Sequence, residues 1–379
     1  MKIAFAGSGT GGHFYPNIAI AEAVTDLVRQ QHLLAPRFYY LAPMEFDKQA
    51  LYDNEIRFIR IRAGKVRRYR SFSNVTDAIK TVWGTCTAIW VLFWLYPDVI
   101  ISKGGYASVP ITIAARVLRI PLIIHESDAK PGRGNLLASK WAQKIAISFA
   151  SAQKYFPPSV QSKIARTGIP VRKELAHLET EGAKEYLQLD PALPTVLILG
   201  GSSGSERINE TVISALPELI ASANIIHQTG RANIKAVTSL ARLTLEKDPH
   251  AARYHPVDYM NGLTLRRAAG AADLVVSRAG STSIAEIALW AKPSILIPIP
   301  EDVSHDQRLN AYAYAQTDAA VVLEQANLTP HILASEIRRI LGDSVLRAKM
   351  AARAKGFTDL DAATLIAKEA IDIGLSHES

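Results

Sequence analysis

The sequence contains one cysteine, Cys86, in 379 residues, so no disulfide can form within the chain. Its first residues run directly into an apolar segment, without the basic stretch, apolar core and cleavage site of a secretory signal. Both absences favour a reducing compartment, and we expect the protein in the cytoplasm. Charged residues make up 21% and apolar residues 48%, close to globular averages, which excludes wholesale disorder, collagen-like repeats and coiled coil.

The sequence also lacks the signatures of several ligand classes. It has no clustered Cys/His zinc motif and no Walker A loop, and we expect neither a metal site nor a bound cofactor. No pair of carboxylates has a clear glycosidase spacing. Basic and aromatic residues are not interleaved, except from Arg67 to Arg70 around Tyr69, so nucleic acid is not an expected partner.

No apolar run is a convincing membrane span. The segment from Thr81 to Pro97 is uncharged and holds three of the five tryptophans, but it includes three threonines, a glycine and a closing proline. It is also shorter than the roughly 20 apolar residues that a transmembrane helix needs. Directly before it, the segment from Arg57 to Lys80 carries eight basic residues and one acid, so the formal net charge of +8 is concentrated there.

A helix in this region would carry an apolar stripe formed by Ile79, Val82, Trp83, Trp90 and Trp94. Beside the cluster of Arg67, Arg68 and Arg70, such a stripe suits shallow insertion at an anionic membrane surface. The alternative is a helix buried between a sheet and its neighbours. We therefore expect either a peripheral membrane contact here or a part of the core.

The length and the rhythm of apolar runs predict an α/β protein with two domains. A chain of 379 residues exceeds what one hydrophobic core usually organises. Near-continuous apolar runs such as VIIS and LIIH favour parallel sheets covered on both faces. We expect two Rossmann-like, doubly wound domains facing each other across a cleft. The first spans 1–165, joined by a C-terminal helix at about 358–379 that packs back on it, and the second spans 166–357.

The individual elements follow from the same alternation. The expected strands are 2–6, 37–41, 57–61, 98–102, 121–125 and 144–148 in the first domain, and 195–199, 224–228, 273–277, 294–298 and 319–323 in the second. The expected helices include 18–29, 111–118, 206–219, 281–291 and 305–316. Ligands of open α/β sheets bind beyond the carboxyl ends of the strands, so the loops that follow the strands are the functional candidates.

The loop after the first strand reads AGSGTGGHFYP and satisfies G-x-G-x-x-G at Gly7, Gly9 and Gly12. A dinucleotide site also requires an acid at the end of the second strand, but the next acid after that strand is Glu45. The loop and the N-terminus of a helix starting at Pro16 can still bind a phosphate group, but NAD is not the expected ligand. His13 is either a surface histidine or a general base with a pKa near neutrality, and its place beside a phosphate loop favours the base.

Two further polar loops follow strands of the first domain. In SKGGYASVP, Gly104 and Gly105 indicate an anion pocket and Tyr106 supplies a hydroxyl or a stacking face, while a tight turn is the alternative. In HESDAKPGRGN, His125 and Glu126 are either part of a polar site or, as we slightly favour, a buried structural hydrogen-bond pair.

Two loops of the second domain have the same character. LGGSSGSERIN follows its first strand, and Ser202 with the neighbouring amides can hold a diphosphate at the start of the next helix. In SRAGSTSIAEIA, Gly280 and the hydroxyl residues after it cap a helix. Glu286 lies one turn further on, where its carboxylate can accept hydrogen bonds from a ribose. The alternative for Glu286 is a capping-box acid.

Taken together, the motifs resemble the MurG family, the metal-independent, inverting N-acetylglucosaminyltransferases of peptidoglycan synthesis in glycosyltransferase family 28. The resemblance covers nearly the whole chain. The motifs that carry it occur in the family's order and are GTGGH at 9–13, KGGYAS at 103–108, HES at 125–127, GIPVR at 168–172, GGSSGSERIN at 200–209, HQTGR at 227–231, RAGSTSIAEIA at 278–288 and DQRLNA at 306–311.

The resemblance implies two facing domains of the GT-B architecture, UDP-N-acetylglucosamine as donor and undecaprenyl-linked lipid I as acceptor, with no metal or cofactor. It implies His13 as the base that deprotonates the acceptor's 4-hydroxyl. The donor-binding positions that it implies are Thr10, Gly11, Gly12, Asp128, Arg172, Ser202, Val257, Ser281, Thr282, Ser283, Glu286 and Gln307. The acceptor-binding positions are Gly104, Gly105, Tyr106 and Asn135, and the loop with Gly11 and Gly12 also receives the acceptor's pyrophosphate. Such an enzyme acts peripherally at the cytoplasmic face of the cell membrane.

The chain departs from the family pattern in two motifs. The family usually reads HEQN where this chain has HESD, so Asp128 replaces an asparagine that contacts the donor. Ile169 stands where the family commonly has asparagine. The alternatives are a related transferase with another nucleotide sugar and lipid acceptor, and a UDP-sugar epimerase or hydrolase on the same fold.

Overall fold

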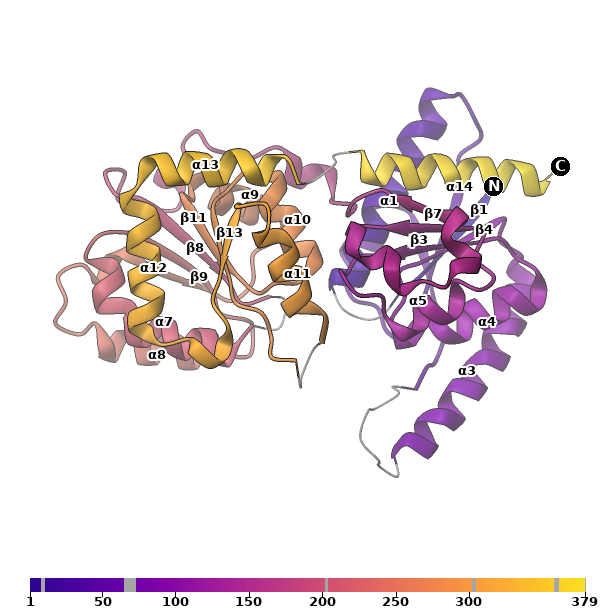
Figure 1. Ribbon diagram of the computed structural model, residues 1–379, viewed down its shortest axis with the longest axis horizontal. Helices are drawn as coiled ribbons and strands as arrows, with labels where there is room; N and C mark the ends of the chain where they lie inside the picture. The colour runs from indigo at the N-terminus through magenta and orange to yellow at the C-terminus, as the bar shows by residue number, and fades with distance from the viewer. Residues whose placement is uncertain (8–10, 65–72, 202–203, 302–304, 358–360, 379) are drawn as a thin grey trace. The chain divides into compact units, whose positions relative to one another are not determined.

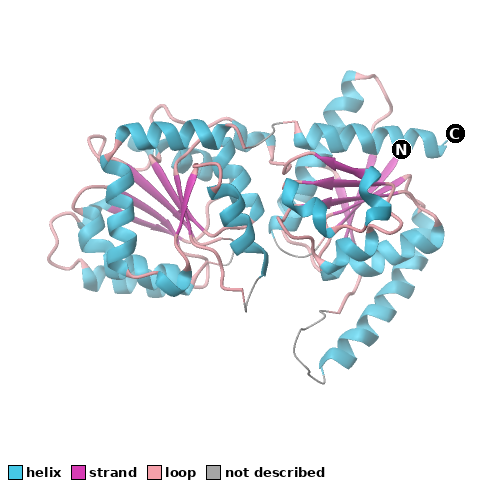
Figure 2. Ribbon diagram, viewed as in Figure 1, coloured by secondary structure: helices cyan, strands magenta, loops and turns pink. Residues whose placement is uncertain are grey.

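A computed structural model describes the chain except for residues 8–10, 65–72, 202–203, 302–304, 358–360 and 379. The chain divides into two compact units. Unit 1 comprises Met1–Arg172 and Asp359–Ser379, and unit 2 comprises Lys173–Thr358. Each unit contains a parallel sheet with helices on both faces (Figures 1 and 2).

The sheet of unit 1 has seven strands in the order β3-β2-β1-β4-β5-β6-β7. Their bounds are β1 (Lys2–Ala6), β2 (Arg37–Ala42), β3 (Ile56–Arg60), β4 (Val99–Ser102), β5 (Leu122–Glu126), β6 (Lys144–Ile147) and β7 (Ile164–Arg166). Every residue of β4 and β5 is buried, as the apolar runs of these two strands require when helices cover both faces of a sheet.

Helices from both ends of the chain cover one face of this sheet. The face is covered by α1 (Gly11–Gln30) and α14 (Ala362–Glu378), which share one apolar core with β1 and β2. Figure 1 shows α14, the last helix of the chain, lying over the unit that contains the N-terminus. The remaining helices of unit 1 are α2 (Lys48–Asp53), α3 (Ser73–Leu95), α4 (Val109–Leu118) and α5 (Arg133–Ala138).

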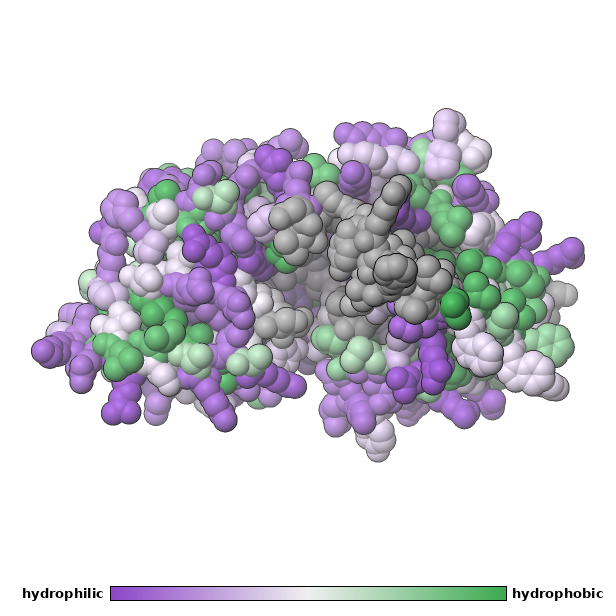
Figure 3. Space-filling view, turned by 90° about the horizontal axis from the view of Figure 1, so that it is seen from below, coloured by the Kyte–Doolittle hydropathy of each residue, from purple (hydrophilic) through white to green (hydrophobic). Residues whose placement is uncertain are grey.

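Helix α3 packs against α4 through Ala88 and Leu92, which are fully buried on the opposite face of the sheet. Much of its remaining surface is exposed and apolar. We define the apolar face of α3 as six side chains that are each at least 55% exposed, namely Ile79, Val82, Trp83, Trp90, Phe93 and Trp94. In Figure 3, which views the molecule from below, hydrophobic side chains gather at the right-hand end, the side on which α3 lies in Figure 1.

The sheet of unit 2 has six parallel strands in the order β10-β9-β8-β11-β12-β13. Their bounds are β8 (Thr195–Leu199), β9 (Asn224–Gln228), β10 (Tyr254–Val257), β11 (Leu274–Ser277), β12 (Ser294–Leu296) and β13 (Ala320–Val322). The helices are α6 (Ala183–Tyr186), α7 (Glu206–Ile220), α8 (Ile234–Thr244), α9 (Gly262–Ala271), α10 (Ser281–Leu289), α11 (His305–Ala315), α12 (Pro330–Gly342) and α13 (Ser344–Lys355).

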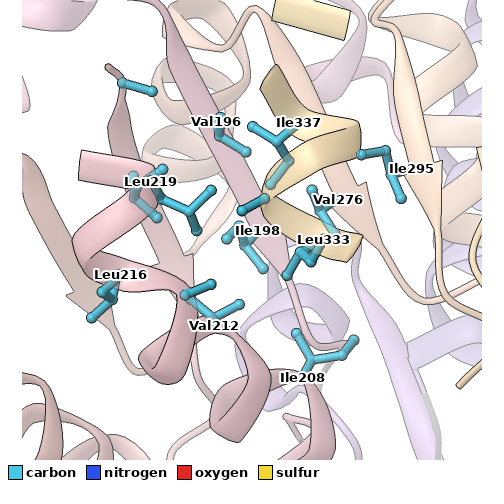
Figure 4. Close-up of a cluster of buried hydrophobic side chains, with 14 of the residues drawn as sticks. Val196, Ile198, Ile208, Val212, Leu216, Leu219, Val276, Ile295, Leu333 and Ile337 are labelled. Carbon is cyan, nitrogen blue, oxygen red and sulfur yellow. The ribbon is translucent and has the colours of Figure 1, made fainter. Parts of the chain in front are cut away.

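Two apolar cores lie on the two faces of the second sheet. One is formed between the strands and helices α7 and α12, where Ile198 of β8 lies between Val212 and Leu333 (Figure 4). The other is formed with α9, α10 and α11 and includes the fully buried Ile287 and Tyr314. Neither core occupies the carboxyl edge of the sheet, where the loops lie.

The observed elements agree with the expected strands and helices within a few residues, with three differences. Strands β7 and β10 were not expected, and both lie at the edges of their sheets. The predicted helix start at Pro16 is wrong, because α1 begins at Gly11 and contains Pro16. The backbone of Gly11, Gly12 and His13 therefore lies in the first turn of α1.

Candidate functional site

The order of strands in unit 1 brings three polar loops together. Strand β4 lies between β1 and β5, with Ser102 paired to Ala6 on one side and to Ile124 on the other. The backbone N–H of Lys103 donates to the carbonyl of Ala6 at 2.9 Å, which continues the pairing past the end of β4. The carboxyl ends of β1, β4 and β5 therefore lie next to one another at one edge of this sheet.

His13 lies in the first turn of α1, directly after the loop that follows β1. Although part of this residue reaches solvent, burial among protein atoms and the nearby Lys103 ammonium lower the pKa of His13 to about 4, while Asp128 opposes this shift. The expected pKa near neutrality is therefore wrong, and the imidazole is neutral at pH 7. Gly11 is buried and Gly12 is exposed beside it, and Thr10 lies outside the described residues.

The loop after β4 depends on two glycines with positive φ. Gly104 has φ +77° and Gly105 has φ +79°. A Cβ on Gly104 would lie 2.7 Å from the side chain of Asn135, so this backbone approaches α5 as only glycine allows. Tyr106 follows in a short 3₁₀ turn and is half-buried. The structure thus brings Gly104, Tyr106 and Asn135 to one place, next to the loop that follows β5.

Lys103, which was not among the expected site residues, has only 3% of its surface exposed. Its ammonium Nζ lies 2.6 Å from Nδ1 of His125 and also contacts Oγ of Ser127. Burial lowers the pKa of Lys103 to about 8, while the carboxylates of Glu126 and Asp128 favour the ammonium. The signal in the sequence was a lysine directly after an apolar strand, in a loop that already showed two glycines.

His125 and Glu126 are buried, but their hydrogen bonds go to other partners than each other, which corrects the expected pair. Nε2 of His125 lies 3.0 Å from the carbonyl of Gly168, and burial together with Lys103 holds the pKa of His125 well below its usual range. Glu126 accepts hydrogen bonds from the amides of Asp128 and Gly132 at 2.9 and 3.0 Å. Nδ2 of Asn135 donates to Glu126 at 2.9 Å. Burial and Asp128 nevertheless raise the pKa of Glu126 to about 7.

Arg172, the last residue of the N-terminal segment of unit 1, contacts a residue of α1. Its guanidinium lies 4.0 Å from the centre of the Tyr15 ring, a stacking contact between a cation and an aromatic face. The hydroxyl of Tyr15 in turn donates to Asp47 at 3.1 Å. The structure therefore places Arg172 against the same helix that carries His13.

The carboxyl edge of the second sheet carries the other expected residues. Strand β8 lies between β9 and β11, so the loops after β8 and β11 are neighbours. The loop after β8 contains Gly201 and Gly204 with φ of +86° and +76°, and Ser202 lies outside the described residues. Ser205 caps α7 by accepting from the amide of Ile208 at 3.3 Å.

Arg278 connects these two loops. Its guanidinium donates to Oγ of Ser205 at 2.6 Å and to the carbonyl of Ile297 at 3.1 Å. Burial lowers the pKa of Arg278 to about 10, which leaves the side chain charged at neutral pH. Arg278 is therefore a half-buried side chain that joins the start of α7 to the residue that follows β12.

Helix α10 begins directly after β11 with three hydroxyl residues. Gly280 is its N-cap and makes no side-chain capping bond, so Ser281, Thr282 and Ser283 form the first turn. Glu286 is half-buried and lies beyond the third helical position, where a capping-box acid would stand. The capping-box alternative for Glu286 is therefore wrong, and its carboxylate lies one turn beyond three hydroxyls and a helix N-terminus.

Val257 and Gln307 lie at the same edge of the sheet. Val257 ends β10, and its carbonyl accepts from the amide of Thr229 at 2.9 Å and from the Thr229 hydroxyl at 3.2 Å. Gln307 lies in the first turn of α11, and its Oε1 accepts from the amide of Ile299 at 3.2 Å. In strand order, β12, which precedes α11, is next to β11, whereas β10 is separated from β11 by β9 and β8.

The surface of unit 1 offers a second kind of site. The five residues of the predicted stripe are all exposed, so the alternative of a buried helix is wrong for them, and Phe93 extends the apolar face of α3. Among the described residues, no helix is both long and apolar enough to cross a membrane. The expected arginine neighbours, Arg67, Arg68 and Arg70, lie outside the described residues.

A basic pocket of roughly 340 Å³ opens where α4 ends. Its lining includes the exposed cations Arg116, Arg119 and Lys140 together with the half-buried Trp141. Because α4 is the helix against which α3 packs, this pocket and the apolar face of α3 belong to one helical layer of the unit. The layer therefore combines exposed aromatic side chains with clustered positive charge.

Family models match both units of the chain. Residues 3–147 match the N-terminal domain of glycosyltransferase family 28, and residues 195–366 match its C-terminal domain. A curated relative from Bacillus anthracis, named UDP-N-acetylglucosamine--N-acetylmuramyl-(pentapeptide) pyrophosphoryl-undecaprenol N-acetylglucosamine transferase 2, is 34% identical over 89% of this chain and 91% of its own.

Solved structures give the same picture of the fold. The crystal structure of Acinetobacter baumannii MurG superposes with a TM-score of 0.71 at 25% identity, over 98% of this chain and 99% of that one. A UDP-GlcNAc 2-epimerase from Neisseria meningitidis bound to UDP-GlcNAc reaches 0.70 at 15% identity, over 98% and 100%. The second likeness concerns the fold alone.

Proposed function

The chain belongs to glycosyltransferase family 28, and we propose that it transfers N-acetylglucosamine from UDP-N-acetylglucosamine to the 4-hydroxyl of the N-acetylmuramyl unit of an undecaprenyl-pyrophosphoryl acceptor. This reaction converts lipid I into lipid II in peptidoglycan synthesis. The observation that carries the proposal is the gathering of the family's motif residues at the carboxyl edge of each sheet. In open α/β folds this edge is the one that binds ligands.

We assign the donor to unit 2. The amides and hydroxyls of Ser281, Thr282 and Ser283 at the start of α10 are suited to the diphosphate, because a helix N-terminus attracts negative charge. Glu286 would accept hydrogen bonds from the ribose, and Gln307 would contact the sugar hydroxyls. The backbone at Val257 would meet the uracil. Ser202, which lies outside the described residues, belongs to the same proposed diphosphate site.

We assign the acceptor to unit 1. We also assign four residues of this unit to donor binding, namely Thr10, Gly11, Gly12 and Arg172. The positive-φ backbone at Gly104 and Gly105 is suited to the pyrophosphate, and Tyr106 and Asn135 flank it. His13 would take the proton from the acceptor's hydroxyl. A neutral imidazole has a lone pair for this task, and a bound pyrophosphate would favour the imidazolium and raise the pKa of His13 in the complex.

The proposed reaction is a single displacement. The acceptor's 4-oxygen forms a bond to C1 of the donor sugar on the face opposite the diphosphate, while the bond from C1 to the diphosphate oxygen breaks. The electron pair of that bond leaves with UDP, and the hydroxyl proton passes to His13. Amides at the start of α10 stabilise the charge that grows on the leaving diphosphate more than they stabilise the ground state. The product linkage is therefore inverted.

A lipid-linked acceptor also gives a role to the apolar face of α3. We propose that this face inserts shallowly into the membrane, with Arg116, Arg119 and Lys140 against anionic lipid headgroups. Exposed tryptophans are suited to this position because their rings are apolar and carry one polar group. The protein would then act peripherally at the cytoplasmic face of the membrane, where its acceptor is anchored.

The test of the activity uses the purified full chain, UDP-N-acetylglucosamine and a short-chain lipid I analogue. Mass spectrometry should find the disaccharide product together with UDP. Release of UDP without disaccharide would instead favour a hydrolase, and conversion of the donor to an isomer would favour an epimerase. Transfer from a different nucleotide sugar in a competition assay would change the donor assignment.

The membrane contact is tested by sedimentation with vesicles of neutral or partly anionic phospholipid. The double variant Trp90→Ala/Trp94→Ala should bind anionic vesicles at least about tenfold more weakly. Burial of the apolar surface of each exposed tryptophan should contribute about 1–2 kcal/mol to the binding free energy. Tyr52→Ala, at another exposed aromatic residue of unit 1, should bind like the wild type. Binding that ignores both lipid charge and the tryptophans would refute the contact.

A further inference from the structure

The proposed function assigns no role to the motif HQTGR at 227–231, which spans the carboxyl end of β9 and the residues after it. Strand β9 lies between β8 and β10 in the sheet of unit 2. The loop after β8 contains Ser202, which belongs to the proposed diphosphate site. The loop after β10 follows Val257, whose backbone would meet the uracil. The motif therefore stands between the two strands whose loops would hold the two ends of UDP.

The side chain of Gln228 makes one hydrogen bond to each of these loops. Gln228 is buried, with only 7% of its surface exposed. Its amide Nε2 donates to the carbonyl of Gly201 at 3.3 Å, and its Oε1 accepts from the backbone N–H of Met260 at 3.0 Å. Because Nε2 can only donate and Oε1 can only accept, the two bonds also fix how the terminal amide is turned. One buried side chain thus joins the loop after β8 to the loop after β10.

The backbone after Gln228 holds the loop after β10 at two further points. The N–H of Thr229 donates to the carbonyl of Val257 at 2.9 Å, and the N–H of Gly230 donates to the carbonyl of Asp258 at 3.0 Å. Three successive residues of the motif therefore contact this loop. Gln228 differs from the other two because its bond comes from the side chain, so a substitution can remove it without changing the backbone.

The carbonyl that Gln228 binds in the other loop belongs to a glycine turn. Gly201 has φ +86°, a conformation that residues other than glycine rarely adopt. Its carbonyl also accepts from the N–H of Gly204 at 3.1 Å. A carbonyl oxygen that faced a bound diphosphate would repel it, because both carry negative charge. The bond from Nε2 of Gln228 instead keeps this oxygen turned toward β9.

We propose that Gln228 is a positioning residue for the donor, and that its side-chain amide fixes the spacing between the loop for the diphosphate and the loop for the uracil. This inference rests on the proposed function, because the two loops carry these roles only in the donor assignment. With the spacing fixed in advance, a nucleoside diphosphate binds both loops without having to order them. The affinity for UDP then benefits from the simultaneous engagement of both loops.

The first test needs no ligand and therefore separates this inference from the proposed function. Gln228→Met keeps the length of the side chain but removes the strong acceptor of the Met260 amide. Hydrogen exchange followed by NMR should become at least about tenfold faster at Met260, since a local hydrogen bond has been lost. The amide of Thr229, which is bonded to backbone, should exchange as in the wild type. Unchanged exchange at Met260 in the folded variant would overturn the inference.

The second test compares UDP with its two parts. UDP, uridine and inorganic pyrophosphate are titrated separately into the wild type and Gln228→Met. The variant should bind UDP about tenfold more weakly, a change of the size that two neutral hydrogen bonds contribute. Uridine and pyrophosphate, which each need one loop, should lose less than about threefold. In turnover assays the KM for UDP-N-acetylglucosamine should rise about tenfold, while kcat and the KM for the acceptor analogue stay within about threefold.

Two further variants complete the design. Gln316→Met changes an exposed glutamine of the same unit and should bind all three ligands like the wild type. Gln228→Asn keeps the amide on a side chain one methylene shorter, too short to reach both loops, and it replaces Gln228→Met if that variant does not fold. It should show the same preferential loss of UDP.

The possible outcomes distinguish the inference from the donor assignment. Equal affinity of the wild type and a folded Gln228 variant for UDP would overturn the inference and leave the donor assignment in place. Equal losses of UDP, uridine and pyrophosphate would also overturn it, because a merely structural role weakens every ligand alike. A wild type that does not bind UDP would overturn the donor assignment itself.

Discussion

The carboxyl edges of the two sheets have the same architecture and opposite chemical character. In unit 1, Lys103, His125 and Glu126 are buried side by side, and Asp128 is half-buried next to them. In unit 2, the corresponding edge presents mainly hydroxyls and amides from 281–283, Gln228 and Gln307, together with the carboxylate of Glu286. One edge is a network of ionisable groups, and the other consists largely of neutral polar groups, with Arg278 and Glu286 among them.

This difference shows which properties follow from topology and which from residue type. Both edges owe their position to parallel strands whose loops meet at one side of the sheet. The chemistry is decided by the few side chains that occupy those loops, as expected when function is grafted onto a common fold. A network of ionisable groups is suited to proton transfer, while hydroxyls, amides and a helix N-terminus are suited to holding a nucleotide.

The largest expected effect comes from removing the proposed base, His13, from the ionisable edge. His13→Ala should lower kcat by about a hundredfold or more without a change in stability, because a positioned base typically contributes that factor. The KM for UDP-N-acetylglucosamine should change little. Turnover measured beside a thermal melt decides the matter, and near-normal turnover of the folded variant would remove His13 from the mechanism.

Substitutions in the glycine turns test how much each carboxyl edge contributes to the free energy of unfolding. Gly204→Ala should lower the free energy of unfolding by about 2–3 kcal/mol, because φ is +76° and a Cβ would lie 2.2 Å from the carbonyl of Thr229. Gly104→Ala should cost less, about 1–2 kcal/mol, since its Cβ would meet the side chain of Asn135, which can move. Gly132→Ala, with nothing within 4 Å, is the control.

Denaturant unfolding of the three glycine variants gives these differences directly. Equal losses at Gly204 and Gly104 would mean that the Asn135 side chain is held as rigidly as backbone. A loss at Gly132 as large as the others would contradict the assignment of the effect to strain and close approach.

At the neutral edge, removing a charge should weaken binding rather than chemistry. Glu286→Gln should raise the KM for the donor by about tenfold, which corresponds to about 1.4 kcal/mol and to the loss of a hydrogen bond to a charged group. Its kcat should fall by much less than that of His13→Ala. Ser214→Ala, at an exposed residue of α7 in the same unit, is the control. A lower kcat with an unchanged KM would place Glu286 in the chemical step instead.

The smallest expected effect is the pH-dependent contribution of a buried histidine of unit 2 to the stability of the fold. Burial lowers the pKa of His227 to about 3, so the folded state favours the neutral ring. The unfolded chain, with a pKa near 6.5, therefore takes up the proton first, and stability falls as the pH drops below about 6.5 toward 3. At pH 6 the loss from this residue should be about 1 kcal/mol. His227→Gln should remove that part of the slope, and His331→Gln, at an exposed position, should leave it in place.

Most of the fold could be predicted because its strands are apolar runs bounded by turns. The two missed strands are β7, with three residues, and β10, which contains Pro256. Both are edge strands, where few residues suffice and a proline is tolerated because one side of the strand has no partner. Local sequence patterns are weakest at such positions.

The site was predicted less completely than the fold. The glycine loops, His13 and Glu286 stand out because their residue types and spacing have a direct physical meaning. Lys103 did not stand out, because nothing in a lysine after a strand says whether its ammonium reaches solvent or turns inward. Its burial depends on the order β1-β4-β5 and on the side chains of His125 and Ser127, which the chain supplies more than 20 residues later.

The amino-acid sequence by itself determined the alternation of strands and helices, the glycine loops, and the family to which the chain belongs, because each of these depends on neighbouring residues. Only the tertiary structure decided that α3 exposes its tryptophans, that His13 has a lowered pKa and that a buried lysine contacts His125 and Ser127. Exposure and pKa depend on which distant segments surround a side chain, and that surrounding exists only once the strands have taken their order in the sheet.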